Sequence, residues 1–431
     1  MKKIQALCVA ALMCCTVFFG CQSTASSPAA SQSTKAPDSA TSTSAPDKSN
    51  ANSTATSSNE DDKWNDMTDE ELYELAKQEG GEITIYSISS RMPRTCEAFM
   101  EAYPELKAVA TDFDQNEAIS KIEIEAKSNN INADVLQCKD SAGEIYYNFF
   151  PSGYLENYFP TDICSKIDPE LLKYGMPFYT GLNFWYYNTQ LHESAPVDNW
   201  WQIIEKDENG NNKYNLVFEN PSSNDTYMAL YCHMILMSDE MAQAYEKAYG
   251  KPLEYTYDAS QTPGVPENNA GYEFLYRLSQ CKLTFIGDGD DIVEAVHGAG
   301  STGIDTLGFC SAGKITNRDD NGWNIAWVDN LDPFVAVMNT NYLYVVKGCD
   351  NPAGARLFIR FLMGGADGNG PGFKPFTKEG NWSIRSDYTN PNNPFGVKDI
   401  NTIPCDIEGI YDFFLDAKDF WDYWLSKSPA K

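Results

Sequence analysis

From about residue 63 onward, hydrophobic and polar positions alternate with two periods. Over residues 69–79, Leu72, Leu75 and Ala76 fall on one helical face, and Thr68 with Glu71 forms a capping box before them. The segment GEITIYS then alternates apolar and polar residues, which predicts a strand. A second helix is expected from about residue 93 to 103. This strand–helix order repeats, which predicts an α/β fold with parallel strands.

The same rhythm continues through the middle and the end of the chain. Further strands are expected at LKAVATDF, ADVLQC, FYTGLNFWYYNT, YNLVFEN, TLGFCSAG, WNIAWVDN and FVAVMNTNYLYVV. A helix is expected over NPAGARLFIRFLMG, where asparagine and proline form a favourable start, and another over the aromatic-rich IYDFFLDAKDFWDYWL.

The N-terminus has the pattern of an export signal. Two lysines precede 16 mostly apolar residues, IQALCVAALMCCTVFF, which is short for a membrane span. Gly20-Cys21 at its end indicates a bacterial lipobox, so we expect a signal peptide over 1–20 and a lipidated Cys21. The alternative is an ordinary signal peptide with a free Cys21. Residues 21–62 are rich in Ser, Thr, Ala and Pro and predict a flexible tether.

Length and charge limit the classes of function. About 370 residues after the tether exceed one hydrophobic core, so two domains are expected. The formal net charge of −29 argues against a nucleic acid or an anionic membrane surface as a partner. Eight cysteines lie beyond Cys21 without a CxxC spacing or a disulfide framework, and we expect most to be reduced and buried.

Six segments in this order resemble the type 2 periplasmic binding proteins of ABC importers. They are LAKQEGGEITIYSISSR, EAFMEAYPEL, ADVL followed by GYLENY, FWYYNTQLHESAPVDNWW, ENPSS and NPAGARLFIRFLM. The branch they resemble most binds ferric iron, thiamine, phosphonates or sugar phosphates. The resemblance implies two lobes, each a mainly parallel sheet flanked by helices, with a ligand cleft between them. It places the crossings near Tyr187 and Asp329, so the first lobe takes 63–187 and 330–431 and the second takes 188–329.

Two loops that follow strands are the first candidates for ligand contacts. Ser89, Ser90 and Arg91 lie between a strand and a helix, where free N–H groups and a guanidinium favour an anion. Ser222, Ser223 and Asn224 repeat this arrangement in the second lobe. The alternative in both loops is that the polar side chains only cap the following helix.

Two further residues are candidates on weaker grounds. Asp140 follows the ADVLQC strand, where the resemblance places the cleft wall, although it is also suited to capping the next helix. Trp185, Tyr186 and Tyr187 lie in one strand, where successive side chains point to opposite faces. Either Trp185 with Tyr187 or Tyr186 alone is therefore able to face the cleft. The alternative for each of them is packing in the core.

Metal and catalytic motifs are not found in the sequence. Ferric-binding relatives carry a late tyrosine pair, where this chain has GFCSAGK, and its adjacent pairs Tyr146-Tyr147 and Tyr186-Tyr187 lie elsewhere. No HExxH, GxSxG or nucleotide-binding glycine motif occurs. We therefore expect no metal site, no cofactor and no catalytic residues.

Together these patterns predict a monomeric, lipid-anchored solute-binding protein on the outer face of the cell membrane. It would capture a small anionic or phosphorylated solute and deliver it to an ABC permease. A ferric iron or iron-chelate binder is the alternative within this class. A surface hydrolase or an adhesin on the same fold is the alternative outside it.

Overall fold

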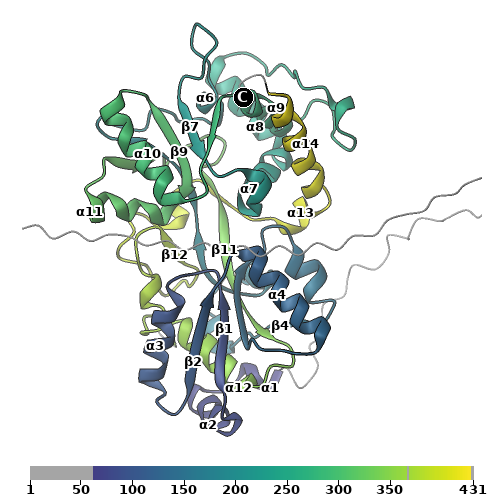
Figure 1. Cartoon of the computed structure of the whole chain (residues 1–431), viewed down its shortest axis with the longest axis vertical. Coiled ribbons are helices and arrows are strands. Elements are labelled where there is room, and N and C mark those ends of the chain that lie inside the picture. The colour runs from purple at the N-terminus through teal and green to yellow at the C-terminus, as the bar shows by residue number, and fades with distance from the viewer. Residues whose placement is uncertain (1–61, 366–367, 429–431) are drawn as a thin grey trace, which may run out of the picture. The chain divides into compact units, whose positions relative to one another are not determined.

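The computed structural model describes residues 62–365 and 368–428, and these residues belong to one compact unit (Figure 1). The predicted signal peptide, Cys21 and the tether up to residue 61 lie outside the described residues. Within the described ranges, no helix is long and apolar enough to cross a membrane.

The first sheet has the strand order β12-β5-β11-β3-β1-β2, and β4 and β13 also pair with β11. β1 pairs in parallel with β2 and β3, whereas β11 runs antiparallel to β3, β4 and β5. The bounds are β1 Glu82–Ser87, β2 Lys107–Asp112, β3 Val135–Lys139, β4 Leu155–Glu156, β5 Met176–Gly181, β11 Ala336–Val346, β12 Asn381–Ser383 and β13 Thr402–Pro404.

Helices flank this sheet, and the helix that follows Thr68 begins as predicted. The Thr68 hydroxyl accepts from the Glu71 N–H, and a Glu71 carboxylate oxygen accepts from the Thr68 N–H at 2.9 Å. The bounds are α1 Asp62–Asn65, α2 Asp69–Glu79, α3 Met92–Ala102, α4 Gln115–Ser128, α5 Thr161–Cys164 and α12 Pro352–Leu362. Short turns are η1 Ile145–Phe149, a single π-helical segment, η2 Pro169–Tyr174, η6 Lys374–Phe376 and η7 Val397–Asp399.

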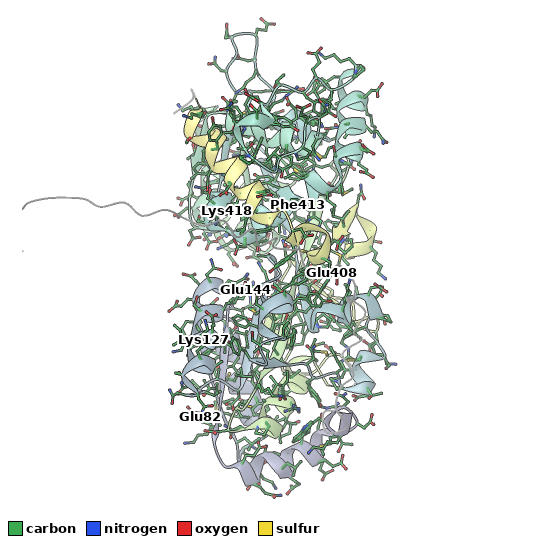
Figure 2. All side chains as sticks on the ribbon, turned by 90° about the vertical axis from the view of Figure 1, so that its right-hand side faces the viewer. Glu82, Lys127, Glu144, Glu408, Phe413 and Lys418 are labelled. Carbon is green, nitrogen blue, oxygen red and sulfur yellow. The ribbon has the colours of Figure 1, made fainter. Side chains whose placement is uncertain are left out.

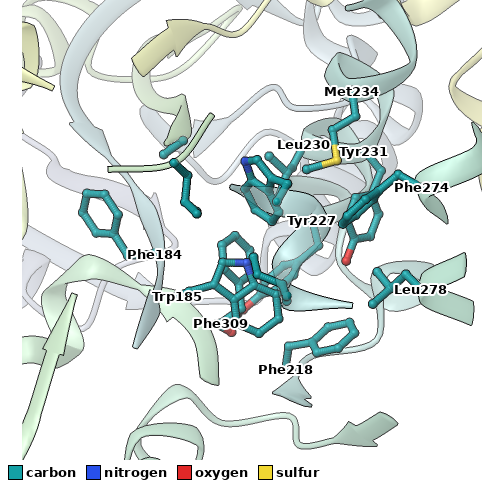
Figure 3. Close-up of a cluster of buried hydrophobic side chains, with 14 of the residues drawn as sticks. Phe184, Trp185, Phe218, Tyr227, Leu230, Tyr231, Met234, Phe274, Leu278 and Phe309 are labelled. Carbon is teal, nitrogen blue, oxygen red and sulfur yellow. The ribbon is translucent and has the colours of Figure 1, made fainter. Parts of the chain in front are cut away.

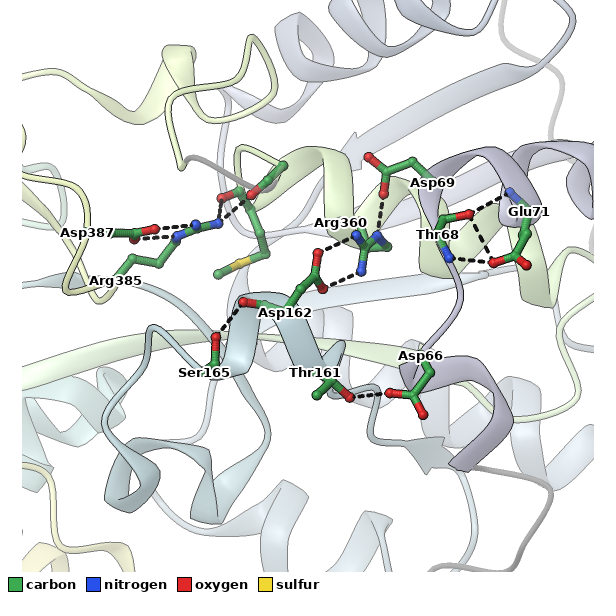
Figure 4. A network of polar contacts seen from close by, with 12 residues as sticks. Asp66, Thr68, Asp69, Glu71, Thr161, Asp162, Ser165, Arg360, Arg385 and Asp387 are labelled. Atoms are coloured by element: carbon green, nitrogen blue, oxygen red, sulfur yellow. Dashed lines mark hydrogen bonds and ion pairs between the residues drawn. The ribbon is translucent and has the colours of Figure 1, made fainter.

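A buried arginine on α12 ties three of these helices together (Figure 4). The Arg360 guanidinium donates to both carboxylate oxygens of Asp162, at 2.8 and 2.7 Å, and also to Asp69. Burial opposes this charge, but hydrogen bonds to Asp162 and Asp69 keep the pKa of Arg360 above its ordinary value. Such a bidentate pair fixes both distance and orientation, so α2, α5 and α12 are held in one register.

The second sheet has the strand order β10-β6-β9-β7-β8, with parallel β7 pairs and antiparallel β6 pairs. Its strands are β6 Asn183–Asn188, β7 Asn215–Phe218, β8 Leu283–Phe285, β9 Thr306–Ser311 and β10 Ile325–Trp327. The helices around it are α6 Trp200–Ile203, α7 Asp225–Leu236, α8 Ser238–Tyr249, α9 Ala270–Ser279, α10 Gly289–Thr302 and α11 Asn317–Asn321, with turns η3 Pro221–Ser223, η4 Ala259–Gln261 and η5 Ala312–Thr316. The α/β fold with two lobes is therefore confirmed, with mixed sheets.

The first crossing between the sheets lies earlier than the sequence suggested. The apolar run FYTGLNFWYYNT is divided at Leu182 into β5 of the first sheet and β6 of the second. Leu182 is fully buried, and Gly181 and Asn183 flank it where the chain changes its partner strand. The second crossing, between β10 and β11, spans the expected position near Asp329.

A third crossing was not foreseen, because the sequence assigned all of 330–431 to the first lobe. After β13 the chain enters α13 Ile407–Tyr411 and α14 Phe414–Lys427, which contact α7 and α9 of the second lobe. Figure 2 follows this segment from Glu408 to Lys418. Phe420 and Trp421 are fully buried in the second core, and burying two aromatic rings there stabilises this placement.

The cysteines in the described part of the chain form no disulfide. All eight are free, and five of them are buried: Cys96, Cys138, Cys232, Cys281 and Cys310. Burial raises the pKa of Cys96 to about 12, so this thiol stays protonated at neutral pH. These cysteines act as small apolar core residues.

Candidate functional site at the junction of the lobes

The loop after β1 is held by the neighbouring strand β3. The Ser87 hydroxyl donates to Gln137 Oε1 at 2.6 Å, and the Ile88 N–H donates to the same oxygen at 3.2 Å. The Ser89 hydroxyl oxygen accepts a hydrogen bond from the Arg91 N–H, so this side chain stabilises the loop backbone. Ser90 is exposed. The loop is therefore fixed before the chain enters α3 at Met92.

The Arg91 guanidinium reaches from the first lobe towards the second. Its Nη2 lies 3.7 Å from the position that a Cβ atom would take on Gly313 in η5. Burial raises the pKa of Tyr179 on β5, and the nearby Arg91 charge opposes that rise. Among the described residues, Arg91 has no ion pair and no side-chain hydrogen bond. A half-buried guanidinium without a partner has its five N–H donors available for a ligand.

Three asparagines lie beside Arg91 at the same end of the first sheet. Asn339 on β11 and Asn381 on β12 both pair with Gly181 of β5, and Asn341 pairs with Tyr179. Because Gly181 has no side chain, space remains between the flanking amides. We call Gly181, Asn339, Asn341 and Asn381 the amide bay.

Each asparagine of the amide bay has a buried side-chain atom without a partner. These atoms are Asn339 Oδ1, Asn341 Nδ2 and Asn381 Nδ2. Asn341 is only 1% exposed, and its Oδ1 accepts from Gln137 Nε2 at 2.7 Å, which leaves Nδ2 free. A buried amide without a hydrogen bond costs on the order of 1–3 kcal/mol. The three atoms belong to β11 and β12, the two strands that flank β5, and they make this end of the sheet the candidate ligand site.

A second unpaired cation, Lys139, lies at the end of β3. Burial lowers its pKa, and the Glu219 carboxylate of the second lobe opposes that shift. Glu219 follows β7, and burial raises its pKa, while Asn224 Nδ2 donates to it at 2.6 Å. The charges of Lys139 and Glu219, one from each lobe, thus lie close enough to influence each other, and Lys139 forms no ion pair among the described residues.

Asp140 caps the next helical segment, which is the alternative role that the sequence suggested for it. Its two carboxylate oxygens accept from the N–H groups of Ile145, at 3.0 Å, and Tyr146, at 2.9 Å. It also lines a pocket of about 280 Å³ between α4 and Asp225 of the second lobe. Glu123 and Glu144 line this pocket too, so its acidic walls do not suit an anion.

Trp185 is a core residue, which corrects its place among the ligand contacts. It is 2% exposed and packs against the rings of Trp200, Phe218 and Phe309 inside the second lobe (Figure 3). The strand alternates as expected, and the side chain of Trp185 is covered by Trp200 of α6. Trp185 itself is therefore closed off from a ligand.

The polar side chains of the loop Ser222–Asn224 form hydrogen bonds within the protein. Asn224 Oδ1 accepts from the N–H groups of Thr226 and Tyr227 and so caps α7. Ser223 donates to the Asn220 carbonyl, and Ser222 donates to Asp422 on α14. Unlike Arg91, none of these predicted contacts presents a free charged group.

The adjacent tyrosine pairs Tyr146-Tyr147 and Tyr186-Tyr187 make contacts within the protein. The Tyr186 hydroxyl donates to the carbonyl oxygens of Ser311 and Ala312, both at 2.9 Å. Tyr146 donates to Glu408, and Tyr147 stacks on Tyr411 with ring centroids 3.9 Å apart. Among the residues described, no group of three or more His, Cys, Asp or Glu side chains is placed to hold a metal ion.

The residues that the sequence reasoning missed are Lys139, Glu219 and the amide bay. One signal was present: NTN interrupts the otherwise apolar strand FVAVMNTNYLYVV, and asparagine is depleted in strands. Its two asparagines share one face because they are two residues apart. Asn381 had no comparable signal, since its strand is only three residues long.

Solved structures are similar to this chain over most of its length. Iron-bound HitA from Pseudomonas aeruginosa aligns with a TM-score of 0.58 and 14% identity, over 79% of this chain and 98% of HitA. AfuA from Actinobacillus pleuropneumoniae, with fructose-6-phosphate bound, aligns with a TM-score of 0.53 and 17% identity, over 80% and 98% of the two chains. The chain has the type 2 periplasmic-binding-protein fold.

A third example with this fold has a different ligand. The binding protein MotA from A. tumefaciens B6, in complex with glucopine, aligns with a TM-score of 0.53 and 12% identity, over 80% of this chain and all of MotA. No family model matches the sequence, and no curated protein matches it either. The periplasmic-binding-protein fold is thus established by structure, while ligand and partner must be argued from the site.

Proposed function

We propose that this protein is the solute-binding component of an ABC importer and that it binds a small anionic solute between its two lobes. The observation that carries the proposal is the unpaired Arg91 guanidinium, which extends from the first lobe to Gly313 of the second. A ligand that neutralises Arg91 would contact both lobes at once. Binding would therefore favour their closed arrangement, which is the form that a permease recognises in a hinge-closure mechanism.

The chemistry of the site favours an acidic group joined to a polar body. A phosphate or carboxylate at Arg91 accepts two parallel hydrogen bonds, and Lys139 supplies a second positive charge nearby. The amide bay offers two amide NH2 groups and one carbonyl acceptor, which suit the hydroxyl groups of a sugar or a comparable polyol. A phosphorylated sugar or a hydroxylated carboxylate combines both features.

Ferric iron is the second candidate, because HitA is iron-bound and has the same fold. The amide bay supplies few of the hard, charged oxygen ligands that ferric iron favours. An iron chelate with an anionic carrier suits Arg91 better than the bare ion does. We regard the protein as a binding component without catalysis, as the groups at the junction include no nucleophile paired with a base.

We further propose that the protein is attached to the outer face of the cell membrane through a lipid on Cys21, and that it acts as a monomer. The support is the apolar run that ends at Gly20-Cys21. Replacement Cys21→Ser should move the protein from the membrane fraction to the soluble fraction. Unchanged fractionation of that variant would exclude the anchor.

A thermal-shift screen of the purified protein tests the proposed function. The panel contains sugar phosphates, phosphonates, hydroxy acids, thiamine, polyamines, ferric chloride and ferric citrate. A ligand at 100 times its Kd stabilises the folded protein by about 2.7 kcal/mol, which raises Tm by several degrees. We expect the largest shift from an anionic solute. Stabilisation by ferric chloride alone would contradict the anionic ligand class.

A further inference from the structure

A groove separate from the amide bay runs along β10, the edge strand of the second sheet. It encloses about 680 Å³ and is lined on one side by Tyr187, Trp327 and Asp329 of the second lobe. The other side is formed by Glu379 and by residues 391–395, from the segment that follows β12 and precedes η7. Neither Arg91 nor any residue of the amide bay lines this groove.

The groove carries an excess of negative charge. Glu193, Asp329 and Glu379 line it together with a single cation, Arg318. Arg318 is already neutralised, because it pairs with Glu379 at 3.0 Å and with Asp319 at 3.1 Å. Glu193 and Asp329 are exposed and have no ion pair among the described residues. Two carboxylates therefore remain without a counter-charge.

Aromatic side chains lie beside these carboxylates. The rings of Trp327 and Phe395 are 5.5 Å apart, and Phe395 also stacks on Trp382 at an angle of 15°. Burial raises the pKa of Tyr187, and the nearby Asp329 charge raises it further, which places Asp329 close to the Tyr187 hydroxyl. Aromatic faces attract cations, and the attraction adds to that of the carboxylates.

We propose that this groove is a second ligand site, which takes an organic cation: an ammonium group attached to a hydrocarbon or aromatic body. The ammonium group lies between Asp329 and Glu193, and the apolar part lies against Trp327 and Phe395. Because the groove is built from both lobes, its occupancy also changes with the angle between them. A cation bound here is thus energetically coupled to solute binding at the junction.

Calorimetric titration with benzyltrimethylammonium tests the site. We expect a Kd on the order of 1 mM or below, as for a few cation–π and ionic contacts at a partly exposed site. The double variant Glu193→Gln with Asp329→Asn should weaken binding about tenfold, since it removes both unpaired charges. The matched control Glu208→Gln removes an exposed carboxylate of the same lobe outside the groove and should leave the Kd unchanged.

Three results would overturn the proposal. The first is no binding of benzyltrimethylammonium at about ten times the expected Kd. The second is equal binding of neopentylbenzene, its neutral analogue, which would show that charge is not recognised. The third is loss of cation binding in Arg91→Ala with no loss in the double variant, which would place the probe at the junction. Failure of the anionic-solute screen leaves these outcomes unaffected, so the two proposals are tested separately.

Discussion

The two lobes offer the same loop type at the junction but use it differently. In both lobes, a polar loop follows a parallel strand and precedes a helix, namely Ser87–Arg91 after β1 and Asn220–Asn224 after β7. In the second lobe, Asn220 accepts from Ser222 and from Trp421, and Asn224 caps α7. In the first lobe, the Ser89 hydroxyl oxygen accepts from the Arg91 N–H, while the Arg91 guanidinium has no partner among the described residues.

This difference shows what distinguishes a binding loop from a capping loop. Both provide side chains that satisfy N–H groups near a helix start. Only the loop that also leaves a charged or amide group without a protein partner is able to recognise a solute strongly. The free polar groups of the proposed site therefore lie in the first lobe, and the second lobe adds Glu219 and the close approach of Gly313.

The largest effect is expected from Arg91→Ala, measured by calorimetry with the solute that the screen identifies. Loss of a buried bidentate contact costs on the order of 2–4 kcal/mol, or roughly thirty-fold to several hundred-fold in affinity. Arg91→Lys should recover only part of this, because it keeps the charge but loses the planar pair of donors. The unliganded Tm should change by only a few degrees.

Equal affinity of wild type, Arg91→Ala and Arg91→Lys would show that the first-lobe loop does not recognise the solute through Arg91. Arg91 would then be a solvated side chain, and recognition would rest on the amide bay and on the acidic pocket near Asp140. The control Arg94→Ala, which removes an exposed arginine one turn along α3, should leave affinity unchanged in either case.

A smaller effect is expected from Asp140→Asn, which tests a capping residue inside the first lobe. Burial raises the pKa of Asp140 to about 6, above its value of about 3.9 in the unfolded chain. The folded state thus holds a proton that the unfolded state releases, and this contribution to stability is lost as pH rises from about 4 through 6. Denaturant melts should show wild type losing on the order of 2–3 kcal/mol relative to Asp140→Asn between about pH 4 and pH 7. Parallel pH profiles would show that Asp140 ionises freely.

The smallest effects are expected in the second loop, with Ser222→Ala and Asn224→Ala. Removal of the α7 cap in Asn224→Ala should lower the free energy of unfolding by about 1 kcal/mol, and Ser222→Ala by less. Solute affinity should stay within about twofold of wild type in both. A loss of affinity as large as that of Arg91→Ala would make the two lobes equal partners in recognition.

The fold was predictable from the sequence because its signals are local and repeated. The capping box at Thr68, the strand of NTN and the α/β order all depend on residues close to one another in the chain. The site was predictable only in part. Arg91 could be predicted as a candidate because it follows a strand. Lys139 and Asn381 could not, because the residues that make them candidates lie more than 70 residues away in the chain. Trp185 was misplaced because alternation gives two faces and does not reveal which of them is covered.

The third crossing at α13 has a mechanical consequence. A single peptide connection between two bodies permits rotation in any direction, and two connections define an axis. Here β5–β6, β10–β11 and β13–α13 all join the same two bodies, and the last of them is bound to the second lobe by Phe420 and Trp421. Any rotation must therefore bend at least one connecting segment. The three connections therefore restrict rotation of one lobe against the other more tightly than two would.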